Sequence, residues 1–541
     1  MKILIIPFFF LFAFCSLYAQ HGYVMATTEG IVVEKEIKTY LPATSPITVN
    51  QFFPISQSTL GFPIHSYYDL EKTISEEKSK EIDSYIQYIM EDQKIPGLAL
   101  AITHNGEVQK KKTYGLASIE YNVPVSDSSV FWIASISKHI TCTAIMLLAQ
   151  DGIIDIDDKI NEYLPDTPDH WQDITIRHLM THTSGLPESG KGSERGERSV
   201  KGTYSAEEMF NYAKKDSLAF QPGTDFLYSD EGIFLLGYLI HKISGMSFKE
   251  FMQKRIFDPS GMNTAYLMDH FEIHPNQVTG YAKKDGLIIP DRNYWRLLDT
   301  EINAAGGVYA SIDDMINWEK TLLGDLLTPE SKRSMWTPHS LNDGNNANYG
   351  FGWNAQSING EKIIYHPGVA GTEFLRFLDN DISIIVLTNQ ADYQRSIAHK
   401  ISEILEISPE KGEDDFISGR ISKQTPHQGE IEKMVGEYLF IPNGNFYLDD
   451  PIEIRISAEK DQVWIEFPTN KKYHNKYKMV KIENGKWVQL SWDPVATEFT
   501  YDLQEDKDGA VTISVFENYG PGISIHIGEL KRRDNETIGK R

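Results

Sequence analysis

The chain has 541 residues and a formal net charge of -24 at pH 7, and 41% of its residues are hydrophobic. This acidic balance argues against nucleic acid or an anionic membrane surface as a partner. The length is sufficient for about two or three domains, each with its own core.

The N-terminus predicts an export signal. Residues 1–19 carry one lysine, an apolar core and a small residue, Ala19, at the expected cleavage position. The apolar core is too short for a membrane span. Phe14 is too bulky for the residue before a lipidated Cys15, which favours cleavage after Ala19 over a lipoprotein anchor. We expect a periplasmic or extracellular protein in which only Cys142 remains, without an intramolecular disulfide.

The next elements predict a sheet built from two distant parts of the chain. Residues 20–75 show little periodicity and are expected to form an N-terminal extension. A polar helix is predicted over 76–93, and Asn105-Gly106 then separates two strand-like runs, a strong hairpin signal. Strand-like runs return after a helix-rich middle, as KIIYHPG, TEFLRFL and ISIIVLTNQ. This order predicts one antiparallel sheet with a helical region inserted between its early and late strands.

The C-terminal part changes to a period of two. Residues 411–428 are polar and predict a linker. Apolar residues then alternate, as at Ile452, Ile454 and Ile456, and hairpin turns are expected at Asn484-Gly485 and Asp508-Gly509. Residues 429–541 are therefore predicted to be a separate antiparallel β-domain, a barrel or a sandwich. Its expected role is packing on the catalytic domain, with shaping of site access or partner binding as alternatives.

Three short motifs follow one another along the chain. They are Ser135-Ile136-Ser137-Lys138, Tyr228-Ser229-Asp230 and His366-Pro367-Gly368. The first opens an apolar helix that stops at Gly152, and its spacing places Ser135 and Lys138 on one face of the first turn. The positive end of the helix would favour an alkoxide and help to hold the lysine neutral. In isolation the motif would also fit an N-cap serine and a surface lysine.

Residues from about 76 to 410 resemble the serine β-lactamase-like family of class C β-lactamases, D-alanyl-D-alanine carboxypeptidases, D-aminopeptidases and related esterases. Further similar stretches are Ile174–Pro187, Pro222-Gly223, Gly261-Met262, Ala305–Val308 and Tyr349–Trp353. The resemblance implies an α/β (α+β) fold of the β-lactamase and transpeptidase kind, in which helices flank an antiparallel sheet and a helical region is inserted.

The resemblance also implies catalytic roles. Ser135 would attack a carbonyl and become acylated, while Lys138 and Tyr228 share the removal of its proton, with the formal base left open between them. Tyr228 would then protonate the leaving group and activate the deacylating water. The backbone N–H groups of Ser135 and Val369 would form the oxyanion hole. His366, where many relatives carry lysine, would be the fourth catalytic residue.

Two departures from the β-lactamase pattern bear on the substrate. His366 replaces the permanent cation of Lys-Thr-Gly, and Asp230 replaces the usual asparagine. Both changes lower the affinity for anions, so an ester, an amide or a peptide whose amine faces Asp230 is favoured over a carboxylate-bearing β-lactam. Asp230 and Gly368 are the expected substrate-binding residues. The alternative for Asp230 is a solvated or lysine-paired carboxylate.

The sequence indicates neither a metal nor another cofactor. His178 and His182 have the spacing of zinc-binding helix histidines, but the segment between them lacks the catalytic glutamate. We therefore expect an exported serine hydrolase that forms an acyl-enzyme on Ser135. Its expected partner is a small-molecule or peptide substrate, an amide, an ester or a peptide, including peptides that contain D-amino acids. The alternatives are a β-lactamase, a cell-wall D,D-carboxypeptidase, or a slowly deacylating penicillin-binding or sensor protein.

Overall fold

The computed structural model divides the chain into two units, Met1–Asp69 and Leu70–Arg541. In the first unit it describes an antiparallel hairpin of β1 (Val24–Thr27) and β2 (Gly30–Val33). In the second it describes residues 74–187, 204–269, 272–284, 287–291, 300–358, 361–390, 397–407, 423–424, 426–442, 452–459, 462–467, 475–482, 485–489, 498–505, 511–520 and 523–532. The predicted signal peptide at 1–19, most of the predicted extension at 20–75 and most of the predicted linker at 411–428 lie outside these ranges.

A seven-stranded antiparallel sheet forms the centre of the second unit. Its order is β11 (Asn354–Ile358), β12 (Glu361–Gly368), β13 (Thr372–Phe377), β14 (Ile382–Thr388), β3 (Gly97–His104), β4 (Glu107–Ser118) and β5 (Val123–Pro124). The early and late strands meet where Ile384 of β14 pairs with Ile102 of β3. Asn105 and Gly106 both have positive φ, 51° and 74°, as the β3–β4 hairpin turn requires. The predicted sheet and hairpin are confirmed.

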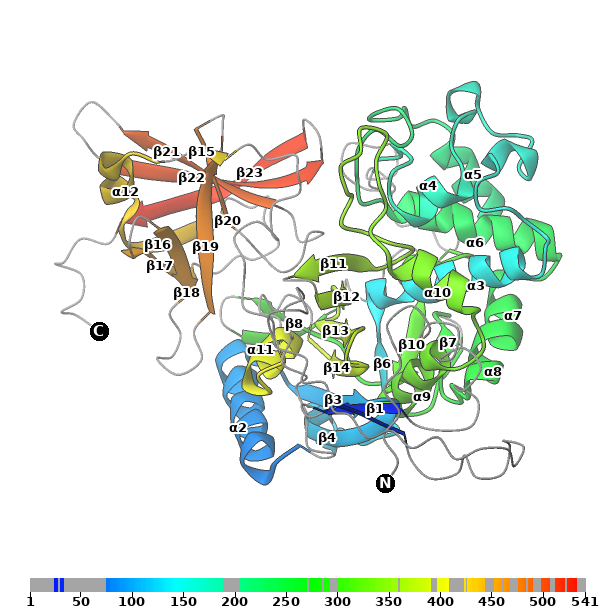
Figure 1. The fold of residues 1–541 in the computed structure, drawn as a ribbon, viewed down its shortest axis with the longest axis horizontal. Helices are drawn as coiled ribbons and strands as arrows, with labels where there is room; N and C mark the ends of the chain where they lie inside the picture. The colour runs from blue at the N-terminus through cyan, green and yellow to red at the C-terminus, as the bar shows by residue number, and fades with distance from the viewer. Residues whose placement is uncertain are drawn as a thin grey trace, which may run out of the picture. The chain divides into compact units, whose positions relative to one another are not determined.

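The two faces of the sheet bury different side chains. In β3, Leu98, Leu100 and Ile102 face α2 (Glu76–Gln93) and α11 (Ile397–Ile404), while Ala99 and Ala101 join the larger core under the helical region. The helices α3, α9 and α10 lie on that second side of the sheet (Figure 1). The small side chains of Ala99 and Ala101 let the sheet and these helices approach closely.

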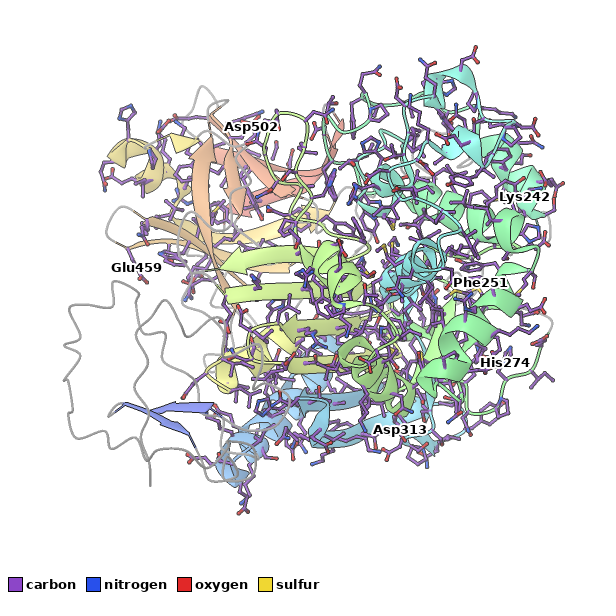
Figure 2. All side chains as sticks on the ribbon, turned by 45° about the vertical axis from the view of Figure 1, so that its right-hand side comes forward. Lys242, Phe251, His274, Asp313, Glu459 and Asp502 are labelled. Carbon is purple, nitrogen blue, oxygen red and sulfur yellow. The ribbon has the colours of Figure 1, made fainter. Side chains whose placement is uncertain are left out.

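The helical region supplies the remaining core. Its helices are α3 (Ser137–Gln150), α4 (Ile176–Met180), α5 (Ala206–Ala213), α6 (Asp230–Ser244), α7 (Phe248–Met252), α8 (Asp258–Ser260), α9 (Ile312–Leu323) and α10 (Pro329–Trp336). Two small sheets accompany them, β6 (Val130–Trp132) with β10 (Val308–Ser311) and β7 (Tyr266–Leu267), and β8 (Tyr281–Lys284) with β9 (Leu287–Pro290). Figure 2 shows Lys242 on α6 and Phe251 on α7, of which only Phe251 is in the core. No described helix combines the length and the apolar character needed to cross a membrane.

The structure corrects the predicted start of the apolar helix. Ser135 lies in a 3₁₀ turn, Ala134–Ile136, and the α-helix α3 begins only at Ser137. No side chain caps the first turn of α3, so Ser135 is not an N-cap residue. The predicted end is close to the observed one, because α3 ends at Gln150 and Gly152 has a φ of 70°.

The C-terminal part forms a nine-stranded antiparallel sheet. Its strands are β15 (Lys423–Gln424), β16 (Gly436–Pro442), β17 (Ile452–Glu459), β18 (Gln462–Phe467), β19 (Asn475–Ile482), β20 (Trp487–Gln489), β21 (Glu498–Glu505), β22 (Val511–Gly520) and β23 (Ile523–Arg532), with Glu459 and Asp502 labelled in Figure 2. Pairing of β19 with β20 closes β16 through β23 into a ring, which is the barrel topology.

Two details refine the C-terminal prediction. β15 falls in the segment predicted as linker, yet it pairs with β19, so the sheet begins earlier than expected. The helix α12 (Gln428–Met434) contributes Ile431 and Met434 to the core of the barrel. The antiparallel β19–β20 and β21–β22 pairs agree with the hairpins expected at Asn484-Gly485 and Asp508-Gly509, although residues 483–484 and 506–510 lie outside the described part.

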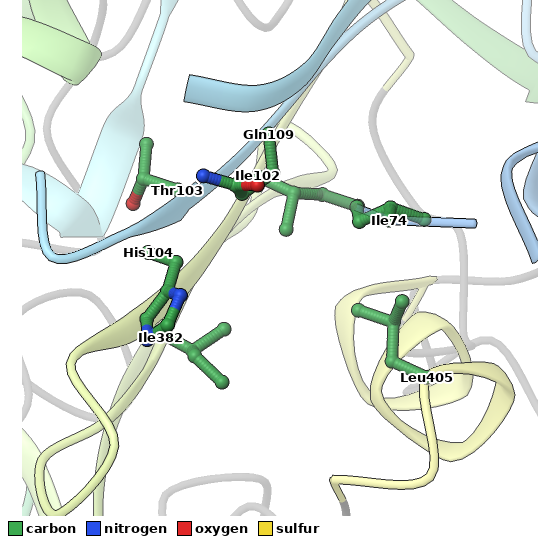
Figure 3. A pocket seen from close by; sticks show the side chains of 7 residues that line it. All are labelled: Ile74, Ile102, Thr103, His104, Gln109, Ile382 and Leu405. Atoms are coloured by element: carbon green, nitrogen blue, oxygen red, sulfur yellow. The ribbon is translucent and has the colours of Figure 1, made fainter. Parts of the chain in front are cut away.

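A small pocket lies on the α2 and α11 side of the central sheet (Figure 3). Its lining is mainly apolar and consists of Ile74, Ile102, Thr103, His104, Gln109, Ile382 and Leu405. None of these residues belongs to the three sequence motifs. The motifs lie on the other side, where α3 begins.

Gly352 shows how closely the backbone packs beneath the first motif. Its φ is 73°, and a Cβ at this position would lie 2.6 Å from the Cα of His139 and 2.8 Å from the carbonyl oxygen of Lys138. Gly152 has nearly the same φ, 70°, but nothing lies within 4 Å of its Cβ position. An alanine at position 152 would therefore meet only the cost of the left-handed backbone, whereas an alanine at position 352 would also clash with α3.

We predict that Gly152→Ala lowers the free energy of unfolding by about 1 kcal/mol, the cost of a left-handed alanine. Gly352→Ala should lose a further 1 to 3 kcal/mol or so, because its Cβ overlaps backbone atoms that cannot rotate away. Urea unfolding of both variants measures the difference. Equal losses would contradict the close approach of this turn to α3.

Candidate active site

The first motif lies on a strained turn. After β6, the N–H of Ile133 donates to the carbonyl of Val308 at 3.0 Å, and Ala134 then takes a φ of 49° although it is fully buried. An alanine in the left-handed region costs free energy, so the surrounding structure must stabilise this turn. The result is that Ser135 leaves the strand abruptly and precedes α3 by two residues.

The side chain of Lys138 is the centre of the site. Its Nζ lies 2.9 Å from the Oγ of Ser135, 2.9 Å from the carbonyl oxygen of Ala305 and 2.7 Å from Oδ1 of Asp230. The side chain has no exposed surface. Two of these oxygens accept hydrogen bonds from Nζ and the third, on Asp230, is ion-paired with it. These partners suit an ammonium group, whereas the position at the helix end predicted a neutral amine. Asp230 is therefore paired with a lysine, which was the alternative predicted for this carboxylate.

The second motif caps a helix. The Oγ of Ser229 accepts from the N–H of Gly232 at 3.2 Å and donates to the carbonyl of Pro187 at 3.0 Å, so α6 begins at Asp230. This turn directs two neighbouring side chains toward Lys138, because the centroid of the Tyr228 ring is 4.7 Å from Nζ and the carboxylate of Asp230 is ion-paired with it. The side chain of Asp230 is 44% exposed, so the carboxylate also faces solvent.

The third motif approaches the turn of the first. A Cβ on Gly368 would lie 2.5 Å from the carbonyl oxygen of Ile133 and 3.1 Å from the Cβ of Ala134. Only glycine fits there without a shift of backbone. The N–H of Gly371 donates to the carbonyl of Gly368, which turns the chain sharply and leaves Val369 62% exposed. In the described part of the chain, the N–H groups of Ser135 and Val369 donate to no backbone carbonyl.

His366 is engaged by other protein groups. Its Nδ1 donates to the carbonyl of Pro367 at 2.7 Å, and its Nε2 accepts from the hydroxyl of Tyr349 at 3.0 Å. Burial, together with the nearby cation of Lys138, lowers the pKa of His366 to about 3, so the ring is neutral at neutral pH. The centroids of the His366 and Tyr228 rings are 6.3 Å apart. His366 therefore lies near Tyr228, while its two ring nitrogens bond to Pro367 and Tyr349.

Several residues that position the site were not singled out from the sequence. The chain before β10 is tied to the first motif, because Ala304 accepts from the hydroxyl of Thr141, Ala305 from Lys138, and Gly306 from the indole N–H of Trp132. Tyr349, which holds His366, belongs to the Tyr349–Trp353 stretch. Ala305–Val308 and Tyr349–Trp353 both resemble stretches of the family in sequence. The hydrogen bonds that they make to Lys138 and His366 are seen only in the structure.

The two histidines with metal-like spacing accept backbone hydrogen bonds. Nδ1 of His178 accepts from the N–H of Thr175 at 3.2 Å, and Nδ1 of His182 accepts from the N–H of Ser229 at 3.1 Å. Among the described residues, no group of three or more His, Cys, Asp or Glu side chains is arranged to hold a metal ion.

Fold and site together define a class, the serine hydrolases of the β-lactamase fold. The Beta-lactamase family model matches residues 82–407, and the chain belongs to this family. It is 28% identical over 419 residues to penicillin-binding protein 4* of Bacillus subtilis (strain 168), covering 73% of this chain and 88% of that relative. It is also 28% identical over 301 residues to a D-aminopeptidase of Gluconobacter oxydans (strain 621H), covering 54% of this chain and 56% of that enzyme.

Solved structures confirm the predicted fold class. An octameric penicillin-binding protein homologue from Pyrococcus abyssi superposes with a TM-score of 0.55 at 22% identity, covering 84% of this chain and all (100%) of that one. EstCE1, a hydrolase with promiscuous acyltransferase activity, gives a TM-score of 0.53 at 21% identity over 61% of this chain and 98% of its own. The D-amino acid amidase from Ochrobactrum anthropi SV3 gives 0.50 at 22% identity, covering 60% and 97%.

The neutral state of His366 predicts a loss of stability in acid. The pKa is about 3 in the folded chain and about 6.5 in an unfolded one. Between these values the unfolded chain binds a proton that the folded chain does not, so the contribution of His366 is complete above pH 6.5 and is lost as the pH falls toward 3.

We predict that His366→Gln, which removes this titration, loses less stability than the wild type between pH 7 and pH 4. The difference in the two losses should be about 3 kcal/mol. Urea unfolding of both proteins at the two pH values measures it. Equal losses would mean that the ring of His366 is already charged in the folded protein at pH 4.

Proposed function

We propose that the protein is an exported serine hydrolase that forms an acyl-enzyme on Ser135 and cleaves an ester, an amide or a peptide. The observation that carries this proposal is the hydrogen bond of 2.9 Å between the Oγ of Ser135 and Nζ of the buried Lys138, beside the ring of Tyr228. Export rests on the signal-like residues 1–19.

The arrangement around Lys138 supports Tyr228 as the general base. Nζ donates to the Oγ of Ser135 and to the carbonyl oxygen of Ala305 and is ion-paired with Asp230, and an ammonium in this setting has no lone pair with which to accept a proton. In the proposed acylation the Oγ of Ser135 bonds to the carbonyl carbon while its proton passes to the oxygen of Tyr228, taken as a phenolate beside the ammonium. When the bond to the leaving group breaks, Tyr228 returns this proton to the departing nitrogen or oxygen.

The oxyanion hole and the deacylation step complete the proposed mechanism. The N–H groups of Ser135 and Val369 are assigned to the tetrahedral oxyanion, in which each donor is worth about 3 kcal/mol. Tyr228 then takes a proton from a water molecule that attacks the acyl carbon, and Ser135 leaves with a proton. Gly368 permits this geometry because it brings the Val369 turn against the nucleophile turn.

The charges of the site support a neutral or amine-bearing substrate. The cation of Lys138 is compensated by Asp230, and His366 is neutral. A substrate carboxylate would thus find no uncompensated cation among the motif residues. The exposed part of Asp230 can instead accept from a substrate ammonium. Relatives by sequence or fold include a D-aminopeptidase and a D-amino acid amidase, which agrees with an amine-bearing substrate.

The second candidate is a β-lactamase, a cell-wall D,D-carboxypeptidase or a slowly deacylating penicillin-binding protein. It is favoured by the match to penicillin-binding protein 4*, which covers 73% of this chain, more than the family domain alone. The formation of an acyl-enzyme on Ser135 is common to both candidates. The rate of deacylation and the preferred substrate separate them.

We predict that Ser135→Ala abolishes labelling by a fluorophosphonate probe while the thermal unfolding temperature changes little. The hydroxyl caps no helix and accepts one of the two hydrogen bonds from Lys138, so its loss should cost only about 1 kcal/mol. Mass spectrometry of the labelled protein measures the result. Labelling that persists in the variant would place the nucleophile elsewhere, with Ser137 as the first suspect.

We predict that an aminoacyl amide with a free α-amine has a higher kcat/KM than its N-acetylated form, by about 1 to 3 kcal/mol of charge-assisted hydrogen bonding. Asp230→Asn should remove this preference and improve acylation by anionic β-lactams, because it takes a negative charge out of the site. Asp313→Asn is the matched control, since Asp313 also forms a 2.8 Å pair with a lysine, Lys111, and is 54% exposed.

Steady-state kinetics with the two amides and a chromogenic cephalosporin decide the matter. Equal rates on the free and the blocked amine in the wild type would reject the aminopeptidase assignment and favour a plain esterase. A loss of preference in Asp313→Asn as well would show that net charge, rather than the position of Asp230, governs selectivity.

A further inference from the structure

His182 holds the chain on both sides of Tyr228. Its carbonyl oxygen accepts from the N–H of Leu227 at 2.9 Å, and its Nδ1 accepts from the N–H of Ser229 at 3.1 Å. One residue thus binds the N–H groups of both residues that flank Tyr228. A tyrosine held this way has little freedom to shift along the turn that precedes α6.

The ring of His182 also packs on the side chain of Tyr228. Their ring centroids are 4.5 Å apart, and the centroid of the Tyr349 ring is 4.8 Å from that of His182. Tyr349 is in turn hydrogen-bonded to His366. The rings of His182, Tyr349 and His366 therefore form a continuous wall beside Tyr228.

The backbone of His182 takes a left-handed conformation at the contact with Tyr228. The residue has a φ of 56°, in the left-handed region that few non-glycine residues adopt, and is only 1% exposed. Nδ1 accepts a hydrogen bond, so the proton of the neutral ring is on Nε2, and within the described part of the chain Nε2 has no hydrogen-bond partner. Strain and an unpaired buried N–H are typical of functional positions, where geometry outweighs local stability.

The ring remains neutral, as acceptance at Nδ1 requires. Burial lowers the pKa of His182 far below its usual range, and the cation of Lys138 acts in the same direction. A protonated ring would lose the hydrogen bond from Ser229, because both of its nitrogens would be donors.

We propose that His182 is a positioning residue, which holds the phenol of Tyr228 in place for proton transfer by clamping Leu227 and Ser229 and by packing on the ring. This proposal rests on the catalytic role of Tyr228 under the proposed function. A displacement of about 1 Å at a reacting group can cost about a hundredfold in rate, so loss of the clamp should lower kcat and leave KM nearly unchanged.

The test compares two histidines of the same segment in the full-length protein. His182→Phe keeps a ring and removes the acceptor for Ser229, and it should lower kcat on a p-nitrophenyl ester by about tenfold to a hundredfold. His178→Phe is the control, because Nδ1 of His178 accepts the N–H of Thr175 in the same way but is not bonded beside Tyr228. Equal losses in the two variants would overturn the proposal.

A second pair of variants avoids the unfolding that a phenylalanine at a positive φ could cause. Asparagine and glycine both tolerate a positive φ, but only asparagine carries an oxygen that can accept from Ser229. His182→Asn should retain most of kcat, and His182→Gly should lose as much as the phenylalanine variant. Equal kcat values for the asparagine and glycine variants would overturn the role of the hydrogen bond.

A double mutant separates the proposal from the proposed function. Tyr228→Phe should lower kcat by at least about a hundredfold. If His182 acts through Tyr228, adding His182→Phe to Tyr228→Phe should cost little more. Multiplicative losses would overturn the positioning role alone. Full activity of Tyr228→Phe would overturn the catalytic assignment of Tyr228, and the positioning role with it.

Discussion

The buried ammonium of Lys138 is the constraint on which the site depends. A charge taken out of water costs several kcal/mol unless oxygens replace the lost solvent. Here the oxygens come from three segments, the turn at Ser135, the chain before β10 at Ala305, and the start of α6 at Asp230. Each segment must be in place for the charge to be stabilised, so the site is complete only when the helical region has folded.

The same charge sets the state of its neighbours. His366 and His182 are both buried, and in each the cation of Lys138 adds to the effect of burial in lowering the pKa. Neutral imidazoles can accept hydrogen bonds, which His366 does from Tyr349 and His182 from Ser229. The outcome is a site with one compensated ion pair surrounded by neutral polar groups. Such a site offers no uncompensated cation among the motif residues.

Much of the fold follows from local patterns. The helix α2 was predicted with the bounds observed, because its polar face and its buried isoleucines repeat with the helical period. The Asn105-Gly106 turn was predicted since both residues tolerate positive φ. The barrel strands were recognised by their period of two, but closure of the ring and the early start at β15 depend on pairing between distant strands. Local pattern carries no information on which strand pairs with which.

The sequence by itself determined that a serine, a lysine, a tyrosine and a glycine-containing turn occur in the order of a serine hydrolase. Only the tertiary structure decided the partners of these groups: Asp230 on Lys138, Tyr349 on His366, and His182 on both sides of Tyr228. The reason is physical. A residue type fixes which hydrogen bonds a side chain can make, whereas the choice among many possible partners is made by burial, which brings distant segments together and excludes the water that would otherwise compete.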